Sequence, residues 1–386
     1  MYYCRPLIPN DGGISVISLT LSSRLEKAGH VVYSIAKESS INKMYLEKQY
    51  VLPATPANDR SNVCFLSEFI ICHKIDIVIN QQPIDDVAED LWSMVRKKTG
   101  VKVVACLHNP VTRSAINYHL TKEYFLKKKW FGLPFLILSN PLSRIFLKRL
   151  YILKNRNRYL KIVNNSDLVL TLCDGMSEEL FDMIGIKNHN KVRVLPNFLS
   201  NIPDFIPGTA KDNAIVWCGQ VNFDVKRVDV IITLWQSLSK VLSNYKLYIL
   251  GDGPELNNAK KMAQDLNLSN IIFTGRVSPQ EYYTKAKFVI VTSSYESFSL
   301  VTLESMAYSC IPIVFNTFPA ASYIIQGNEG ILIKPYDLTA AQYSIVSLAN
   351  DMDCYGNITP KAYKRALEFS ENEIFERWSS ILKELS

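Results

Sequence analysis

Long apolar runs, closely spaced cysteine pairs, internal repeats and low-complexity tracts are all missing from this chain of 386 residues. No apolar run approaches the ~20 residues that a membrane-spanning helix needs, and no secretory signal opens the sequence. The eight cysteines are scattered, which argues against the usual zinc and redox motifs. Cys106, Cys218 and Cys310 lie in or beside apolar strands and are expected to be small core residues. We therefore expect a cytoplasmic protein without a bound metal ion.

Apolar residues make up 48% of the chain and charged residues 20%, which is enough for large cores. Strand-like apolar runs alternate with helical patterns, which is typical of parallel sheets covered by helices on both faces. Strands are expected at 75–80, 102–107, 168–172, 192–195, 214–218, 245–250, 271–273, 288–292 and 311–315. Helices are expected at 14–27, 87–97, 228–241, 254–266, 279–286 and 300–307.

A stretch at 200–212, with two prolines and a glycine and little periodicity, is the best linker candidate. It divides the chain into domain 1–198 and domain 199–370, and 371–386 is an amphipathic terminal helix. That helix is equally compatible with the second domain and with packing back on the first. The fold class expected is α/β, with two doubly wound Rossmann-like domains that face each other across a cleft.

The segment at 293–314 combines a strand end, a loop, a short helix and a second strand, with Glu296 in the loop and Glu304 inside the helix. A helix N-terminus offers free backbone N–H groups and a partial positive charge to an anion. The pattern therefore predicts a phosphate site flanked by two carboxylates. The competing interpretation is an ordinary amphipathic helix with two incidental acids.

This segment closely resembles the signature of the retaining glycosyltransferase family 4, which has the GT-B fold. Further matches occur in the same order along nearly the whole chain, and their spacing is more specific than any one of them. They are Asp11-Gly12-Gly13, Ala28-Gly29-His30-Val31, Leu107-His108-Asn109, Val194-Leu195-Pro196-Asn197, Gly219-Gln220 with Lys226, Leu250-Gly251-Asp252-Gly253-Pro254, and Phe273-Thr274-Gly275-Arg276-Val277.

The resemblance implies a nucleotide-sugar donor, of the UDP or GDP type, and a saccharide or lipid-linked acceptor. It implies no further cofactor, since the nucleotide sugar is a substrate. The catalytic residues it implies are His108, Glu296 and Lys226. The donor-binding residues it implies are Gly12, Gly13, Gln220, Lys226, Arg227, Gly251, Gly275, Val277, Ser297, Phe298, Ser299, Leu300 and Glu304.

Physical arguments assign roles to these positions. A departing diphosphate needs stabilisation of new negative charge, which Lys226 and the amides near Ser299 and Leu300 supply. The family implies that Glu304 accepts hydrogen bonds from the ribose and Glu296 from the donor sugar. The backbone of Gly275 and Val277 would meet the base. Gly12 and Gly13 would let the first domain's backbone approach the sugar phosphate closely.

Three positions allow more than one interpretation. His108, which the family places near the reacting carbon, is instead a structural residue in the competing interpretation. Lys226 is favoured over Arg227 as the phosphate contact. Gln220 replaces the family's usual arginine, and losing that cation costs about 1.5–3 kcal/mol. We expect Arg227 to compensate; otherwise the chain is slow, or is a non-catalytic scaffold or partner subunit. An epimerase or hydrolase of the same architecture is a further alternative.

The segment 1–9 offers little of the apolar strand expected before the glycine loop, so that strand is short or the natural start lies upstream. The segment 119–161 carries eleven basic residues and one acid, so it holds +10 of charge while the remaining chain holds −3. Its apolar stripe predicts contact with an anionic membrane surface on the cytoplasmic side. A helical insertion with a solvated charged face is the alternative, and no nucleic-acid motif accompanies the basic residues.

Overall fold

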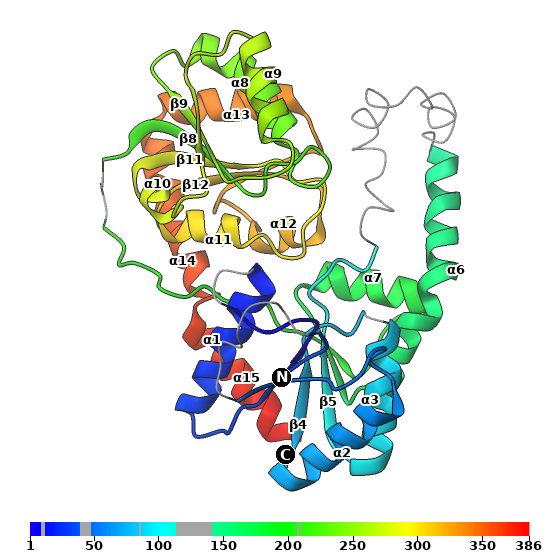
Figure 1. The fold of residues 1–386 in the computed structure, drawn as a ribbon. Helices are drawn as coiled ribbons and strands as arrows, with labels where there is room; N and C mark the ends of the chain where they lie inside the picture. Colours follow the sequence, from blue (N-terminus) through cyan, green and yellow to red (C-terminus); the bar gives the residue numbers. More distant parts are fainter. Residues whose placement is uncertain are drawn as a thin grey trace. The chain divides into compact units, whose positions relative to one another are not determined.

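A computed structural model describes residues 1–386 except 9–11, 39–47, 85, 113–140, 207, 209 and 386, and except the side chains of 86–89 and 141–144. The chain forms two compact units (Figure 1). The first combines Met1–Thr112, Arg149–Phe198 and Glu371–Ser386, and the second combines Leu199–Ser370 with, among the described residues, 141–148.

In the described part of the first unit, seven parallel strands form one sheet with the order β3-β2-β1-β4-β5-β6-β7. The chain reverses its direction of travel across the sheet between β1 and β4. The strands are β1 (Tyr2–Tyr3), β2 (Ser34–Ala36), β3 (Gln49–Val51), β4 (Ile77–Asn80), β5 (Lys102–Cys106), β6 (Leu168–Thr171) and β7 (Val192–Val194).

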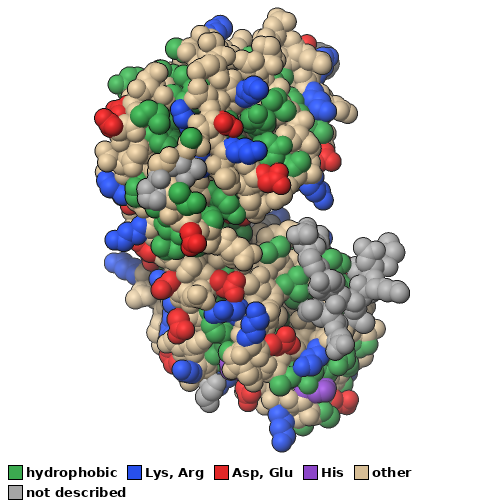
Figure 2. All heavy atoms as spheres, turned by 90° about the vertical axis from the view of Figure 1, so that its left-hand side faces the viewer, with side chains coloured by type: hydrophobic (Ala, Val, Ile, Leu, Met, Phe, Trp, Pro, Cys, Tyr) green, Lys and Arg blue, Asp and Glu red, His purple; other side chains and the backbone are tan. Residues whose placement is uncertain are grey.

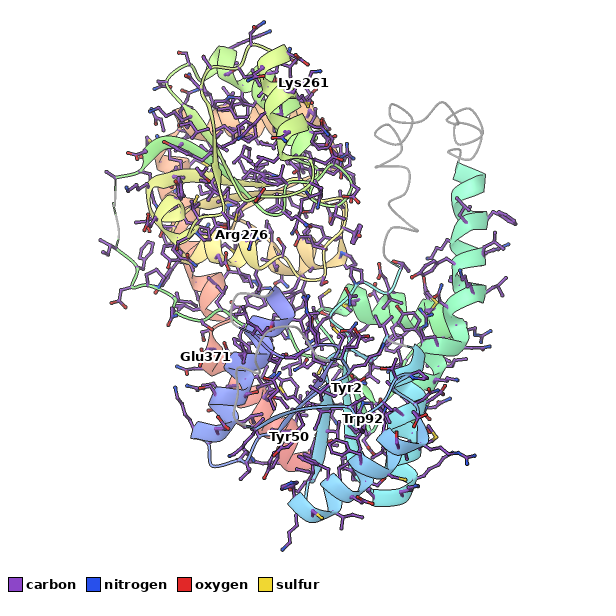
Figure 3. All side chains as sticks on the ribbon, viewed as in Figure 1. Tyr2, Tyr50, Trp92, Lys261, Arg276 and Glu371 are labelled. Carbon is purple, nitrogen blue, oxygen red and sulfur yellow. The ribbon has the colours of Figure 1, made fainter. Side chains whose placement is uncertain are left out.

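Helices cover both faces of this sheet (Figure 1). On one face α1 lies beside α15, where the Arg24 side chain is 3.4 Å from the Glu371 carboxylate and packs over the Phe375 ring. On the other face α2 and α3 pack on the strands, and the rings of Tyr2 and Trp92 meet edge-on at 5.2 Å between centroids (Figure 3). The helices are α1 (Gly13–Lys27), α2 (Arg60–His73), α3 (Asp86–Thr99), α6 (Pro141–Asn165), α7 (Asp174–Ile184) and α15 (Glu371–Leu385).

Helix α2 shows how local sequence sets these elements. Asp59 precedes it and its carboxylate accepts a hydrogen bond from the Ser61 amide, which satisfies one of the free N–H groups of the first turn. Val63, Leu66 and Ile70 follow at helical spacing and are buried against the sheet. The helix ends at Lys74, which is in the left-handed conformation with φ 49°.

In the described part of the second unit, six parallel strands have the order β10-β9-β8-β11-β12-β13. They are β8 (Asp212–Cys218), β9 (Lys246–Leu250), β10 (Ile271–Gly275), β11 (Ala286–Val291), β12 (Ile311–Phe315) and β13 (Ile331–Ile333). Figure 1 shows α8, α9 and α13 on one face of this sheet and α10, α11, α12 and α14 on the other. The helices are α8 (Val228–Val241), α9 (Leu256–Asp265), α10 (Gln280–Lys285), α11 (Leu300–Ala307), α12 (Pro319–Ile324), α13 (Leu338–Asn350) and α14 (Met352–Leu367).

The core of the second unit contains Trp217, Trp235, Phe288 and Phe315, none of which is more than 2% exposed. The chain lays down β8, β9 and β10 in one direction across the sheet and β11, β12 and β13 in the other. The switch point therefore lies between β8 and β11, and ligands of doubly wound sheets bind at the carboxyl ends of the strands beside such a point.

The predicted doubly wound α/β fold is confirmed in both units, with strand and helix ends shifted by a few residues. The sequence left open a short strand before the glycine loop, and the structure contains one, β1. The sequence did not predict β2 and β3, which are three residues long, nor α2, α7, α12, α13, α14 and β13. Strand β1 is short but central, since it pairs with both β2 and β4.

Two properties of the described residues are relevant to what the protein can bind. Within the described residues, no helix is both long and apolar enough to cross a bilayer. On the face shown in Figure 2, lysine and arginine side chains are interspersed with aspartate and glutamate.

Candidate functional site at the switch point of the second sheet

Two loops leave neighbouring strands at the switch point of the second sheet. Strand β8 ends at Cys218, and the following loop runs to Arg227, the residue that precedes α8. Strand β11 ends at Val291, and its loop leads to Ser299, the residue that precedes α11. Because β8 and β11 are paired in parallel, both loops begin at the same edge of the sheet.

Lys226 and Glu296 meet between these loops. The Lys226 Nζ atom is 2.9 Å from Glu296 Oε1, and the two side chains are 24% and 10% exposed. The Ser293 hydroxyl donates a 2.6 Å hydrogen bond to the same Glu296 oxygen. The sequence predicted both charged residues for this site, and the structure joins them as an ion pair at its centre.

The Lys226 loop is held by side chains that the sequence analysis did not single out. The Asn222 side chain accepts hydrogen bonds from the amides of Val225 (3.1 Å) and Lys226 (2.6 Å). The Ser294 hydroxyl donates to the Asp224 carbonyl at 2.6 Å, and its amide donates to the Val225 carbonyl at 2.7 Å. The sequence does contain a signal for Ser294, because polar residues directly follow the apolar strand β11.

Glu304 lies in the second turn of α11 and is partly buried. Burial raises the pKa of its carboxyl group above the ordinary value, although the nearby Tyr283 hydroxyl and Lys226 ammonium act in the opposite direction. Lys226 thus pairs with Glu296 and also lies near Glu304. Tyr283, from α10, was not predicted for this site.

The start of α11 has a distinctive backbone. Ser299 is in the left-handed conformation with φ 63°, and its hydroxyl is 2.8 Å from that of Thr302. Ser297 and Leu300 flank this turn and are partly buried. Phe298 is buried, and its ring packs against those of Tyr323 and Phe369 at 6.3 and 5.7 Å between centroids. The Phe298 side chain is therefore part of the core, and only the backbone of Phe298 is available to the predicted site.

Glycines bring the strand ends together. A Cβ atom at position 251 would lie 1.9 Å from the Gly219 carbonyl oxygen, and one at 253 would lie 2.4 Å from that of Val221. The Gly251 amide donates a 2.8 Å hydrogen bond to the Gly275 carbonyl, where φ is 72°. Val277 follows with a 38% exposed side chain.

Gln220 and Arg227 differ in availability. Gln220 is exposed, and its side-chain carbonyl accepts a 3.2 Å hydrogen bond from Asn222. The Arg227 guanidinium is buried, donates to both carboxylate oxygens of Asp229 at 2.9–3.2 Å, and lies 4.8 Å from the Tyr336 ring centroid. Because its charge is already matched by Asp229, the geometry argues against Arg227 replacing the missing arginine at 220.

The remaining predicted residues lie in the first unit. Gly12 precedes α1 with φ 85°, and Gly13 is the first residue of α1; Asp11 falls outside the described residues. His108 follows β5, is 7% exposed, and its Nε2 atom is 2.5 Å from the side-chain oxygen of Gln81. Gln81 follows the neighbouring strand β4 and was not predicted.

The contact with Gln81 assigns the tautomer of His108. The Gln81 amide nitrogen points to the Met1 sulfur at 3.8 Å, so its oxygen faces the ring and Nε2 carries the proton. Nδ1 is buried and lacks a hydrogen-bond partner among the described residues. Burial lowers the pKa of His108 to about 4, so the imidazole is neutral at physiological pH.

The structure brings together Lys226, Glu296, Glu304 and the glycines of the β8, β9 and β10 ends, while Gly12, Gly13 and His108 belong to the other unit. Within the described ranges, no three His, Cys, Asp or Glu side chains are grouped as metal ligands would be. Such an edge offers a cation, backbone N–H groups and carboxylates, which suits an anionic ligand that also carries hydroxyl groups.

Comparison with known proteins decides the family. Residues 11–200 match the family described as "Glycosyltransferase Family 4", and residues 201–365 match "Glycosyl transferases group 1". The chain belongs to glycosyltransferase family 4. The predicted membership is thus confirmed over both units.

Relatives within the glycosyltransferases are distant. An uncharacterised glycosyltransferase of Haemophilus influenzae is 25% identical over 224 residues, which are 57% of this chain and 62% of the relative. The α-monoglucosyldiacylglycerol synthase of Streptococcus pneumoniae is 30% identical over 149 residues, which are 37% of this chain and 33% of the synthase. The chain therefore covers less than two thirds of either relative.

A solved structure supports the fold. HepE of Anabaena, in complex with UDP, superposes with a TM-score of 0.74 at 12% identity, and the match covers 99% of each chain. At this identity the likeness concerns the fold alone, and it confirms the expected GT-B architecture.

Proposed function

We propose that this glycosyltransferase moves a hexosyl group from a nucleotide sugar, of the UDP or GDP type, to a hydroxyl of a saccharide or lipid-linked acceptor, with retention of configuration and without a metal ion. We place this reaction in the assembly of surface polysaccharide or glycolipid. Support comes from the family, from the name of the pneumococcal relative, which is a glycolipid synthase, and from the UDP bound to HepE.

The observation that carries the proposal is the Lys226–Glu296 pair at the switch point, beside the start of α11. In the proposed complex the Lys226 ammonium and the first amides of α11 stabilise the departing diphosphate. Glu296 accepts hydrogen bonds from the donor sugar and Glu304 from the ribose, while the backbone at Gly275 and Val277 meets the base.

The proposed reaction breaks the bond between the anomeric carbon and the β-phosphate oxygen through an oxocarbenium-like state. The acceptor oxygen bonds to the same face of that carbon, and its proton passes to the departing phosphate. Preorganised positive charge at the phosphate supplies the main stabilisation, so full activity is expected in excess chelator.

A panel of UDP-, GDP- and ADP-sugars tests the donor by thermal shift and by product formation. We expect one nucleotide class to raise the melting temperature and Glu296→Ala to abolish turnover, with Glu281→Ala on the exposed side of α10 as the control. If no nucleotide sugar binds, the proposal is overturned. Binding without turnover favours the scaffold alternative, and conversion of the donor without an acceptor favours an epimerase or hydrolase.

The roles of the two basic neighbours can be separated. Lys226→Ala is expected to weaken donor binding strongly, because it removes the cation beside the diphosphate. Arg227→Ala is expected to lower stability, since it leaves Asp229 without its partner. A loss of donor affinity in Arg227→Ala at unchanged stability would restore the compensation hypothesis for Gln220.

We also propose that α6 contacts an anionic membrane. Of the segment 119–161, residues 119–140 lie outside the described part of the chain. In the described part, Phe146, Leu150 and Leu153 are 59%, 45% and 72% exposed, with Arg149 and Lys154 exposed beside them. An exposed apolar stripe flanked by cations suits an anionic bilayer surface.

Co-sedimentation with vesicles tests this contact. We expect binding to phosphatidylglycerol vesicles, weaker binding to phosphatidylcholine vesicles, and loss of binding in Leu150→Glu/Leu153→Glu. Val241→Glu, which changes a similarly exposed apolar residue of α8, is the matched control. Equal weak binding to both vesicle types contradicts the proposal and leaves the solvated helical insertion.

A further inference from the structure

Thr292 is fully buried at the end of β11, beside the loop that carries Lys226. Its hydroxyl oxygen accepts a 2.8 Å hydrogen bond from the indole N–H of Trp217, the penultimate residue of β8. The same oxygen lies 2.8 Å from the Lys226 carbonyl and 2.9 Å from the Arg227 carbonyl. One hydroxyl thus joins two adjacent strands and the turn between Lys226 and α8.

The direction of these hydrogen bonds is fixed by chemistry. The indole N–H can only donate, and the two carbonyls can only accept. The Thr292 hydroxyl therefore receives from Trp217 and donates its single proton to the Lys226–Arg227 turn. A valine in its place has the same shape but leaves the indole N–H and the carbonyls without this partner.

The turn that Thr292 holds is constrained on its other side as well. Arg227 is in the left-handed conformation with φ 53°, which is unfavourable for a residue with a Cβ atom. Its guanidinium is fixed by Asp229 and by the Tyr336 ring. The backbone at 226–227 is therefore held on both sides, by the Thr292 hydroxyl and by the fixed Arg227 side chain.

We infer that Thr292 is a positioning residue for the donor phosphate contact: its hydroxyl sets the Lys226–Arg227 turn and so places the Lys226 ammonium against Glu296 and the incoming diphosphate. The inference rests on the proposed function, because it concerns how Lys226 performs its role there. Ser293 and Ser294, the next residues, hold Glu296 and the earlier part of the same loop.

A double-mutant cycle with UDP as the probe, and GDP as a second probe, tests the inference by titration calorimetry. Thr292→Val is expected to weaken nucleotide binding on the order of tenfold, as a misplaced contact does. Thr292→Ser keeps the hydroxyl and is expected to restore most of the affinity. In a Lys226→Met background, Thr292→Val is expected to change the affinity by less than about twofold, because coupled residues are not additive.

Thr171→Val is the matched control. Thr171 is also buried at the end of a strand, β6, and its hydroxyl is 2.6 Å from that of Ser177, but it belongs to the first unit. It is expected to lower the melting temperature and leave nucleotide affinity unchanged. If Thr292→Val does not fold, Thr292→Ala deletes the same hydroxyl and takes its place.

Equal losses from Thr292→Val in the two Lys226 backgrounds would show that Thr292 acts independently of Lys226 and would overturn the inference. A Thr292→Ser variant as weak as Thr292→Val would do the same. Failure of the wild-type protein to bind either nucleotide would overturn the proposed donor and, with it, the role of Thr292. The two failures are therefore distinguishable.

Discussion

His108 is a residue whose charge state is set by its surroundings. Its ring is buried, its Nε2–H faces an uncharged amide, and among the described residues burial is the cause that lowers its pKa. The residue is therefore a neutral group whose Nδ1 lone pair is a hydrogen-bond acceptor.

The burial of His108 leads to a prediction for the pKa of its ring. The imidazole of His108 is expected to titrate near pH 4 rather than near the ordinary value of 6.5, because burial disfavours its charged form. Nuclear magnetic resonance of the ring, assigned with His108→Asn, measures the pKa directly. Titration of His108 at its ordinary value would show that the ring is solvated.

The same shift has a consequence for stability. Above pH 6.5 the imidazole is neutral in the folded and the unfolded protein, so it costs no stability. As the pH falls toward about 4, the unfolded chain binds a proton that the folded protein does not, and the free energy of unfolding decreases. The loss amounts to about 3 kcal/mol at ~1.4 kcal/mol per pKa unit. His108→Asn should therefore lose less stability than the wild type between pH 7 and pH 4.5.

The buried carboxylate of Glu304 is expected to strengthen donor binding and to lower the stability of the folded protein. Burial raises the pKa of its carboxyl, so ionised Glu304 destabilises the folded state at neutral pH. This cost decreases as the pH falls through the raised folded-state pKa, and it is gone below the ordinary value of 4.5. Glu304→Gln is expected to melt at a higher temperature at pH 7 and to bind the donor more weakly. Thermal unfolding and donor titration of the same sample measure both effects, and a variant that is less stable at pH 7 contradicts the argument.

At the scale of elements, the closely packed strand ends are the most sensitive positions. Gly251→Ala would place a methyl group 1.9 Å from the Gly219 carbonyl oxygen, at a backbone φ of 135°. We expect a loss of more than about 4 kcal/mol, or failure to fold, because backbone cannot yield as a flexible side chain does.

Gly100→Ala is the matched control for this substitution. Gly100 also has a positive φ, 72°, but no atom lies within 4 Å of its Cβ position. Only the backbone strain of about 1–2 kcal/mol is then expected. Urea denaturation of the two variants measures the difference, and similar losses would show that strain rather than collision governs both.

The elements also show what the sequence can predict. Helices α8 and α11 and strand β12 were predicted to the residue, because each is an apolar run of sufficient length between polar loops. Strands β2 and β3 were missed because three residues carry no periodicity, and for the same reason the short strand β1 was only one of two alternatives. The charged residues of the candidate site were predicted from spacing and resemblance.

Their supporting partners could not be found in this way. Thr292 reaches Lys226 and Trp217, and Gln81 reaches His108, across gaps that only the order of the strands closes. The alternation of strands and helices predicts parallel sheets, but it leaves open which strands are neighbours. For the same reason, the burial of the Arg227 charge against Asp229 and Tyr336 could not be predicted from the sequence.

At the scale of the whole molecule, the first unit depends on a helix from the far end of the sequence. Trp378 of α15 is buried and, with His108, lines a cavity of about 20 Å³. Trp378→Ala is expected to destabilise the first unit by about 3–5 kcal/mol, whereas Glu376→Ala on the exposed side of α15 should have little effect.

Hydrogen exchange separates the two units in this experiment. Amides of β4 and β5 should exchange faster in Trp378→Ala, while those of β8 and β11 should keep their wild-type rates. Uniform acceleration in both sheets would instead indicate that the units unfold as one.

The placement of α15 also orders events during synthesis. Arg24 in α1 bonds to Glu371 and Asn372, which leave the ribosome almost 350 residues later. All strands of the second sheet lie in the continuous segment Leu199–Ser370, so this sheet can be completed while the first unit still lacks its covering helix. The unit that is begun first is therefore finished last, and until then the face that α15 covers is exposed to chaperones and to other chains.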